Sequence, residues 1–191
     1  MYSEDRARET ARFCEWRVEM NVLMLTSRMD IGGAESHVLT LSGALVRLGH
    51  RVIVASAGGR SVPALEESGA RHVTLPLDKK DPASVYLARS GILRLCERFS
   101  PDVVHSHSRI PSFIYGELTG EGSRIPLVTT VHMPFSYDPL TEWGDTQIAV
   151  SRDLAAYLEE KYAIPARRRR GGRRAGSCPL RPRVLRRMPC P

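Results

Sequence analysis

The sequence lacks several features that mark common classes of protein. Its four cysteines, Cys14, Cys96, Cys178 and Cys190, are scattered and form no C-x-x-C pair, so they predict neither a zinc site nor a disulfide framework. No stretch approaches the ~18–20 apolar residues of a membrane span, and residues 1–19 contain no continuous apolar run of the kind found in signal peptides. We therefore expect a cytoplasmic protein, with Cys96 acting as a small buried hydrophobic residue.

Two nucleotide-binding motifs are also missing. The chain has no G-x-G-x-x-G fingerprint, and its second predicted strand ends in Ala55-Ser56, where an acidic residue would bind the ribose of a dinucleotide. It has no G-x-x-x-x-G-K-[ST] sequence either. These absences exclude a dinucleotide-binding Rossmann domain and a P-loop protein.

The excess of basic over acidic residues is confined to one end of the chain. The net charge is +7, but residues 166–191 hold ten arginines and no acidic residue, which leaves 18 basic against 21 acidic residues, or −3, in residues 1–165. An arginine-rich arm could bind nucleic acid or an anionic membrane. A domain of charge −3 offers no basic face to extend such a contact. We therefore expect no nucleic-acid partner, and leave peripheral membrane association open.

Short apolar runs alternate with segments of helical periodicity from Met20 onward. A run bounded by polar residues is typical of a strand buried on both faces. The alternation predicts an α/β domain with a doubly wound, Rossmann-like parallel sheet over residues 20–165. We expect the extension 1–19 and the tail 166–191 to be disordered. The predicted strands cover 21–26, 51–56, 71–75, 101–106, 126–132 and 146–150, and the predicted helices 34–48, 62–68, 82–99, 111–119 and a last one capped by Ser151.

Candidate functional residues follow the predicted strands, where ligands bind in doubly wound sheets. Gly32 and Gly33 stand before the first helix, where backbone N–H groups could approach a phosphate. The alternative is a tight turn that requires positive φ. His132 closes the fifth strand and could contact a substrate hydroxyl or act as a polar catalytic group, although a lone histidine can equally be structural.

A metal site is a further alternative. His105 and His107 point to the same side of the fourth strand and could join His132 around an ion. No carboxylate or cysteine completes that set in the sequence, so we expect no metal.

Six motifs resemble glycosyltransferase family 4. They cover about residues 20–165 and occur in the order and spacing of that family. The motifs are Asn21-Val-Leu-Met-Leu, Gly32-Gly-Ala-Glu35, Leu48-Gly-His50-Arg-Val-Ile-Val, Pro101-Asp-Val-Val-His-Ser-His107, Val128-Thr-Thr-Val-His132 and Ile148-Ala-Val-Ser151.

The resemblance implies the amino-terminal, acceptor-side half of a GT-B enzyme that works without a metal ion or other cofactor. In such an enzyme a nucleotide-sugar donor and a hydroxyl acceptor meet between two Rossmann-like domains. By position, Gly32 and Gly33 match the loop that approaches the donor diphosphate, and His132 a histidine near the transferred sugar. His105, His107 and Ser108 match the acceptor-side loop.

The sequence after Pro165 departs from the family pattern. A family member continues into a donor-binding domain with a Glu-x7-Glu pair, whereas residues 166–191 are rich in Arg, Gly, Pro and Cys. We interpret the tail as a frameshift or truncation product, and Met20 as the natural start of the domain. We therefore expect a glycosyltransferase half that is inactive alone. The alternative is a non-catalytic binding module.

Overall fold

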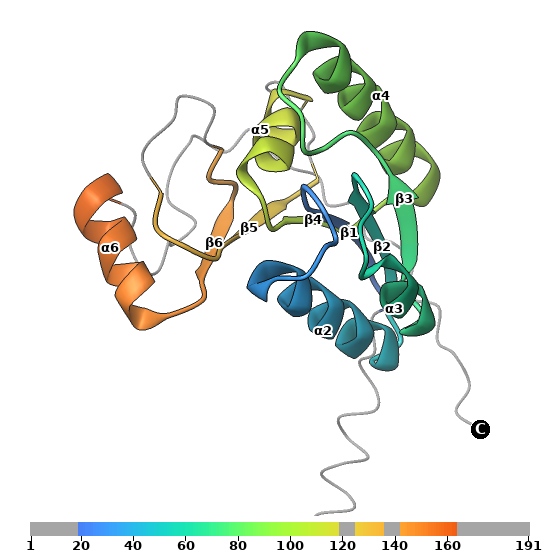
Figure 1. Cartoon of the computed structure of the whole chain (residues 1–191), viewed down its shortest axis with the longest axis horizontal. Helices are drawn as coiled ribbons and strands as arrows, with labels where there is room; N and C mark the ends of the chain where they lie inside the picture. Colours follow the sequence, from blue (N-terminus) through green and yellow to red (C-terminus); the bar gives the residue numbers. More distant parts are fainter. Residues whose placement is uncertain (1–18, 119–124, 136–141, 164–191) are drawn as a thin grey trace, which may run out of the picture.

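A parallel sheet of six strands forms the centre of the molecule, in the order β3-β2-β1-β4-β5-β6 (Figure 1). The computed structural model describes residues 19–118, 125–135 and 142–163. The strands are β1 (Asn21–Leu25), β2 (Arg51–Ser56), β3 (Arg71–Thr74), β4 (Val103–Ser106), β5 (Leu127–Val131) and β6 (Thr146–Ala149). The helices are α2 (Gly33–Arg47), α3 (Val62–Glu67), α4 (Pro82–Phe99), α5 (Arg109–Leu118) and α6 (Arg152–Tyr162). The predicted doubly wound sheet is confirmed.

Helices cover both faces of the sheet, because its central strands are apolar on both sides. β1 is buried at every position. Its residues alternate between two cores: Leu23 packs with side chains of α4 and α5, and Met24 packs with side chains of α2 and α3. α4 and α5 accordingly lie on one side of the sheet and α2 and α3 on the other (Figure 1).

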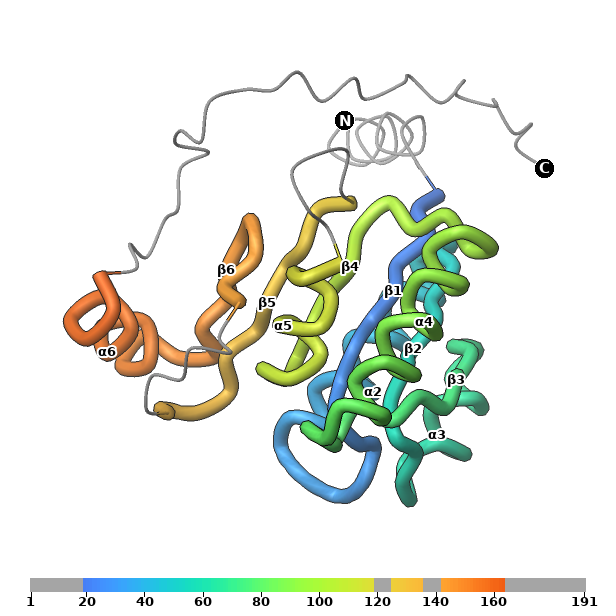
Figure 2. The backbone as a smooth tube through the Cα atoms, turned by 90° about the horizontal axis from the view of Figure 1, so that it is seen from above, coloured from blue at the N-terminus to red at the C-terminus, as the bar shows by residue number. Residues whose placement is uncertain are grey.

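The last helix occupies one end of the sheet. α6 lies beside β6 in both backbone views (Figures 1 and 2), and Leu154 and Leu158 pack on Val131 with a group of aromatic residues. The hydroxyls of Tyr157 and Tyr162 both donate to the carbonyl oxygen of Phe135. α6 thereby fixes the segment that follows β5.

Several helix ends agree with the sequence signals. The Asp81 carboxylate accepts a hydrogen bond from Ser84 N (2.9 Å), and the Ser151 hydroxyl accepts one from Leu154 N (3.1 Å), so both residues act as N-caps. Gly49 follows α2 with φ 88°, the left-handed conformation that glycine adopts most easily after a helix. The predicted helix 34–48 is corrected at its end, because α2 ends at Arg47 and Leu48 is its C-cap residue, 55% exposed.

Three further expectations concern Cys96, membrane-spanning helices and the two ends of the chain. Cys96 is half-buried against the α4–α5 core, and burial raises the pKa of its thiol to about 11, as fits a packing role. Among the described helices, none is long and apolar enough to cross a membrane. The predicted disorder of the tail 166–191 and of residues 1–18, with Cys14, Cys178 and Cys190, lies outside the described residues.

Candidate functional site

The strand order places the candidate residues at the point where the sheet changes direction. The chain moves outward from β1 through β2 to β3 and then crosses back to β4 beside β1. The loops after β1 and β4 therefore diverge at the carboxyl edge, where ligands bind in open α/β sheets. Hydrogen bonds of Ser108 link the first residues of the two loops: its hydroxyl accepts from Ser27 N (3.1 Å) and lies 3.2 Å from Thr26 Oγ1.

Four histidines gather at this edge. The ring centroids of His105 and His107 lie 4.2 Å apart, and those of His107 and His132 lie 5.5 Å apart. His37, one turn into α2, stands edge-on to His132 at 5.2 Å and to His107 at 5.5 Å. Residues from β4, β5 and α2 thus form one cluster.

Hydrogen bonds engage the inner members of the cluster. His105 Nε2 lies 2.8 Å from Thr130 Oγ1, and His107 Nδ1 lies 3.2 Å from His132 Nε2. His107 Nε2 is buried and has no hydrogen-bond partner in the part of the chain that the structure describes. Since His105 and His107 are only 8% and 4% exposed, their side chains are enclosed, and an acceptor role for them remains a prediction.

Burial keeps these imidazoles neutral. Loss of hydration lowers the pKa of His105 to about 4 and that of His107 to about 2, with repulsion among the neighbouring rings as a second cause. Burial also lowers the pKa of His132, and His37 adds to this effect, whereas the negative charge of Glu35 opposes it. At neutral pH, His105, His107 and His132 therefore offer hydrogen bonds rather than positive charge.

Metal binding was the alternative for these histidines. Within the described part of the chain, no group of three or more His, Cys, Asp or Glu side chains is arranged to hold an ion. The reason lies in the geometry, because the rings stack on one another and direct nitrogens to Thr130 and to each other instead of to a common centre.

The glycine pair begins α2. Gly32 is the N-cap residue, in extended conformation (φ −177°), and no side chain caps the helix. Neither Gly32 nor Gly33 has positive φ, so the tight-turn interpretation is wrong. A Cβ added to Gly33 would meet nothing within 4 Å, whereas one added to Gly32 would collide with the Glu35 carboxylate. The first turn of α2 is thus open at Gly33, with an acidic side chain lying over Gly32.

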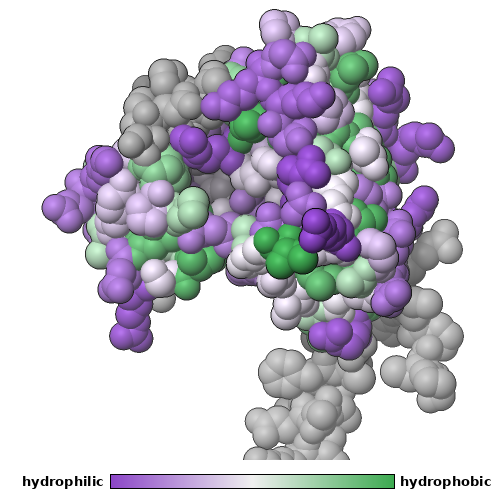
Figure 3. All heavy atoms as spheres, viewed as in Figure 1, coloured by the Kyte–Doolittle hydropathy of each residue, from purple (hydrophilic) through white to green (hydrophobic). Residues whose placement is uncertain are grey.

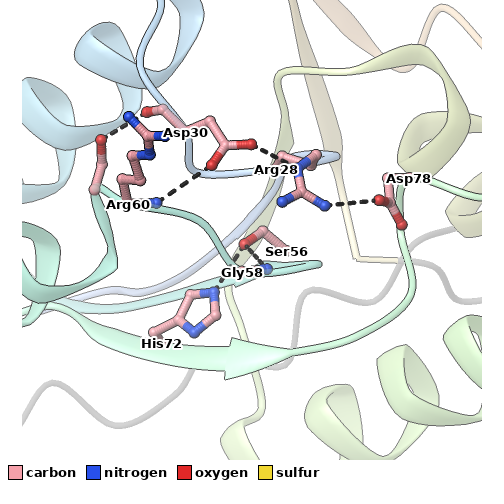
Figure 4. A network of polar contacts seen from close by, with 8 residues as sticks. Arg28, Asp30, Ser56, Gly58, Arg60, His72 and Asp78 are labelled. Carbon is pink, nitrogen blue, oxygen red and sulfur yellow. Dashed lines mark hydrogen bonds and ion pairs between the residues drawn. The ribbon is translucent and has the colours of Figure 1, made fainter.

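A second polar network ties together the loops that follow β1, β2 and β3 (Figure 4). The Arg28 guanidinium forms ion pairs with Asp30 (2.6 Å) and Asp78 (3.1 Å). The hydrogen bond from Arg28 is the main cause that lowers the pKa of Asp30. Ser56 Oγ lies 2.8 Å from His72 Nε2 and accepts from Gly58 N. These contacts fix the carboxyl edge beside the histidine cluster.

Large apolar side chains next to two of the candidate residues in the chain are exposed. Ile31, directly before Gly32, is 79% exposed, and Met133, directly after His132, is 68% exposed. Figure 3 shows a hollow between the surface over α6 and that over α2.

Sequence reasoning missed His37 and Glu35 as members of the site. Both lie in the first turns of α2, and the spacing of Gly33 and His37, four residues apart, places them on one helix face. That spacing was a usable signal for His37. The contact of His37 with His132, which is 95 positions later in the numbering, had no local signal.

Comparisons with known proteins agree with this architecture. The family model described as Glycosyltransferase Family 4 matches residues 31–170. A glycosyltransferase from Rickettsia africae ESF-5 superposes with a TM-score of 0.61 at 22% identity, over 78% of this chain and 41% of that one. MurG from Acinetobacter baumannii gives a TM-score of 0.47 at 15% identity, over 61% and 37% of the two chains. No curated protein sequence matches the chain significantly. The chain thus spans less than half the length of these solved structures.

Proposed function

Since this chain belongs to glycosyltransferase family 4, we propose that it forms the acceptor-side half of an enzyme that transfers a sugar from a nucleotide-sugar to an acceptor hydroxyl. The observation that carries the proposal is the meeting of α2 with the end of β5. His37 of α2 lies 5.2 Å from His132, ring to ring, so the open helix N-terminus and a half-exposed histidine share one edge of the sheet.

The protein must assist the proposed reaction in two ways: it must stabilise the leaving group and position the reacting groups. As the acceptor oxygen bonds to the anomeric carbon, the bond from that carbon to the diphosphate breaks, and negative charge grows on the leaving group. The proton of the acceptor hydroxyl passes to the departing diphosphate oxygen. The uncapped N–H groups of α2 at Gly33, with the positive end of the helix dipole, are suited to that charge. His132 is suited to a hydrogen bond with the reacting sugar or hydroxyl.

The acceptor is proposed to lie over Ser108, which directly precedes α5, beside His132. Because His105 and His107 are buried, we propose that they act indirectly, by supporting His132 and Ser108 from the interior of the domain. The exposed Ile31 and Met133 flank the proposed site, and we expect the donor-binding half or the substrates to cover them. We retain the expectation that transfer requires no metal ion or other cofactor.

We also propose that the 191-residue chain alone transfers no sugar at a useful rate. It spans 41% of the length of the Rickettsia structure, and the groups that neutralise a leaving diphosphate must be held in fixed positions to be effective. The Arg28 guanidinium at this edge is already paired with two carboxylates. The residues of this half of the site are therefore not sufficient for sugar transfer.

A fusion protein tests this proposal. Residues 1–163 would be joined to the carboxyl-terminal half of another family 4 enzyme, and sugar transfer would be measured for the fusion and for the 191-residue chain. We expect transfer only by the fusion, and His132→Ala, which removes a hydrogen-bond donor, to lower its kcat by about 10²- to 10³-fold with an unchanged Tm. His50→Ala is the control, because His50 lies at the opposite edge, beside Met20 N. Rapid transfer by the chain alone, or by the fusion carrying His132→Ala, would contradict the proposal.

A further inference from the structure

The contact between His107 and His132 requires one shared proton. Their nitrogens, His107 Nδ1 and His132 Nε2, lie 3.2 Å apart. Two lone pairs, or two N–H groups, would repel each other at this distance, so one nitrogen donates and the other accepts. The choice determines which nitrogen of His132 carries the proton when that ring is neutral.

The surroundings of His107 decide between the two arrangements. If His132 donated, neutral His107 would carry its proton on Nε2, and that nitrogen is buried without a hydrogen-bond partner among the described residues. A buried N–H without an acceptor costs about 1–3 kcal/mol, and orphaned N–H groups are rarer in proteins than orphaned acceptors. If His107 donates from Nδ1, the enclosed Nε2 holds only a lone pair. The second arrangement is therefore favoured.

We propose that His107 is a positioning residue: its Nδ1–H donates to His132 Nε2 and fixes His132 in the tautomer that carries its proton on Nδ1. His132 Nδ1 has no hydrogen-bond partner among the described residues, and the His132 side chain is half-exposed. The free N–H of His132 is thus available to an oxygen of the bound substrates. His132 acts as a hydrogen-bond donor and not as a base, because its lone pair is occupied.

The same arrangement opposes protonation of His132. An imidazolium at His132 would carry N–H on both nitrogens and would force the His107 proton onto the enclosed Nε2. The other groups that face His132 are His37 and Glu35 from α2, and His105 stands behind His107. Glu35 favours the imidazolium, whereas the neighbouring histidines oppose it. The lowered pKa of His132 agrees with this balance.

Only the role of the His132 N–H in sugar transfer rests on the proposed function. The tautomer of His132 is a property of the chain itself. Two- and three-bond ¹H–¹⁵N correlation spectra of the ¹⁵N-labelled 191-residue chain distinguish the tautomers directly. Near pH 7.5 we expect His107 and His132 both to carry the proton on Nδ1. A His132 proton found on Nε2 would overturn the proposal, whether or not any fused enzyme transfers sugar.

Three variants separate positioning from packing. His107→Phe keeps a ring but removes the donor, so we expect His132 to populate both tautomers and its midpoint of titration to rise. His107→Asn retains a donor at the place of Nδ1, so we expect the Nδ1–H tautomer of His132 to persist. His37→Phe is the matched control for the tautomer, because His37 makes an edge-on ring contact with His132 and, among the described residues, no hydrogen bond to it. The tautomer should not change, and this control is read on the tautomer alone because His37 also lowers the pKa of His132.

The outcomes remain decisive if one variant folds poorly. Dispersed amide spectra would establish that each variant is folded, and the wild-type tautomer alone can refute the inference. In a folded His107→Phe variant, an unchanged tautomer and midpoint for His132 would also overturn it. A tautomer lost in His107→Phe and kept in His107→Asn would support it.

Discussion

Replacement of Gly59 tests whether the loops after β1 and β2 are held in direct contact. Gly59 has φ 148°, and a Cβ added there would lie 2.6 Å from Asp30 N and closer still to the carbonyl group of Met29. Gly59→Ala must therefore push away backbone, which cannot move as a flexible side chain can. Overpacking of this kind costs about 1–3 kcal/mol, and an unfavourable backbone conformation adds about 1–3 kcal/mol.

The neighbouring glycine provides a matched control. Gly58 has φ 86°, and a Cβ added there would meet nothing within 4 Å, so Gly58→Ala carries only the conformational cost, about 1–2 kcal/mol. We expect Gly59→Ala to lower the free energy of unfolding by about 2–6 kcal/mol in total. With a urea slope of about 2 kcal/mol per M, this shifts the midpoint by roughly 1–3 M.

Urea unfolding of the 191-residue chain, followed by far-UV circular dichroism, measures both variants on one scale. Equal losses of stability in Gly58→Ala and Gly59→Ala would refute the reasoning, because the close approach of Gly59 to Met29 would then contribute nothing. A loss confined to Gly59→Ala, or clearly larger there, supports the locked arrangement of the two loops and with it the position of the Arg28–Asp30 ion pair.

Three further predictions concern stability and charge. Leu154→Ala removes a buried side chain of the α6 cluster and should lower the free energy of unfolding by about 2–5 kcal/mol, whereas Leu48→Ala at an exposed position should change it by less than about 0.5 kcal/mol; equal effects in urea unfolding would contradict the packing of α6. The folded-state pKa values of His105 and His107 lie below the usual value, so the unfolded chain binds more protons than the folded chain between about pH 6.5 and 4. The free energy of unfolding should therefore fall as the pH decreases, by up to about 1.4 kcal/mol per pH unit for each histidine. Urea midpoints that do not change from pH 7 to pH 5 would refute this. Glu35→Gln removes a negative charge beside the start of α2 and should tighten the binding of a nucleoside diphosphate by about 2- to 5-fold, measured by NMR titration, whereas weaker binding would argue against a phosphate at this helix end.

The elements of the fold could be predicted because their signals are local. Arg51-Val-Ile-Val-Ala-Ser56 is a bounded apolar run, and β2 has the predicted limits. The predicted helix 82–99 begins where α4 does, since Asp81 as N-cap and Pro82 in the first turn have fixed places in a helix. The predicted helix 34–48 ran one residue too far, because the apolar spacing continues to Leu48, which is the C-cap residue of α2.

The site could be predicted only in outline. Gly32, Gly33 and His132 became candidates because they follow strands, whose carboxyl ends meet at one edge of a parallel sheet, and their functional role stays a prediction. The contact of His107 with His132 and that of Arg28 with Asp78, 50 residues apart, depend on how the loops close. Burial of His105 and His107 was equally hidden, since i and i+2 spacing indicates a shared face and does not say what covers that face.

The binding of a nucleoside diphosphate, mapped on the amide signals of the ¹⁵N-labelled chain, tests the central claim most directly. The claim is that the edge with Gly32, Gly33 and His132 is one wall of a sugar-transfer site. With UDP or GDP at millimolar concentration, the account predicts the largest shifts at Gly32, Gly33 and His132, small shifts at Gly58, and none with the phosphate-free nucleosides. Absence of shifts at the start of α2, or larger shifts elsewhere in the chain, would contradict it.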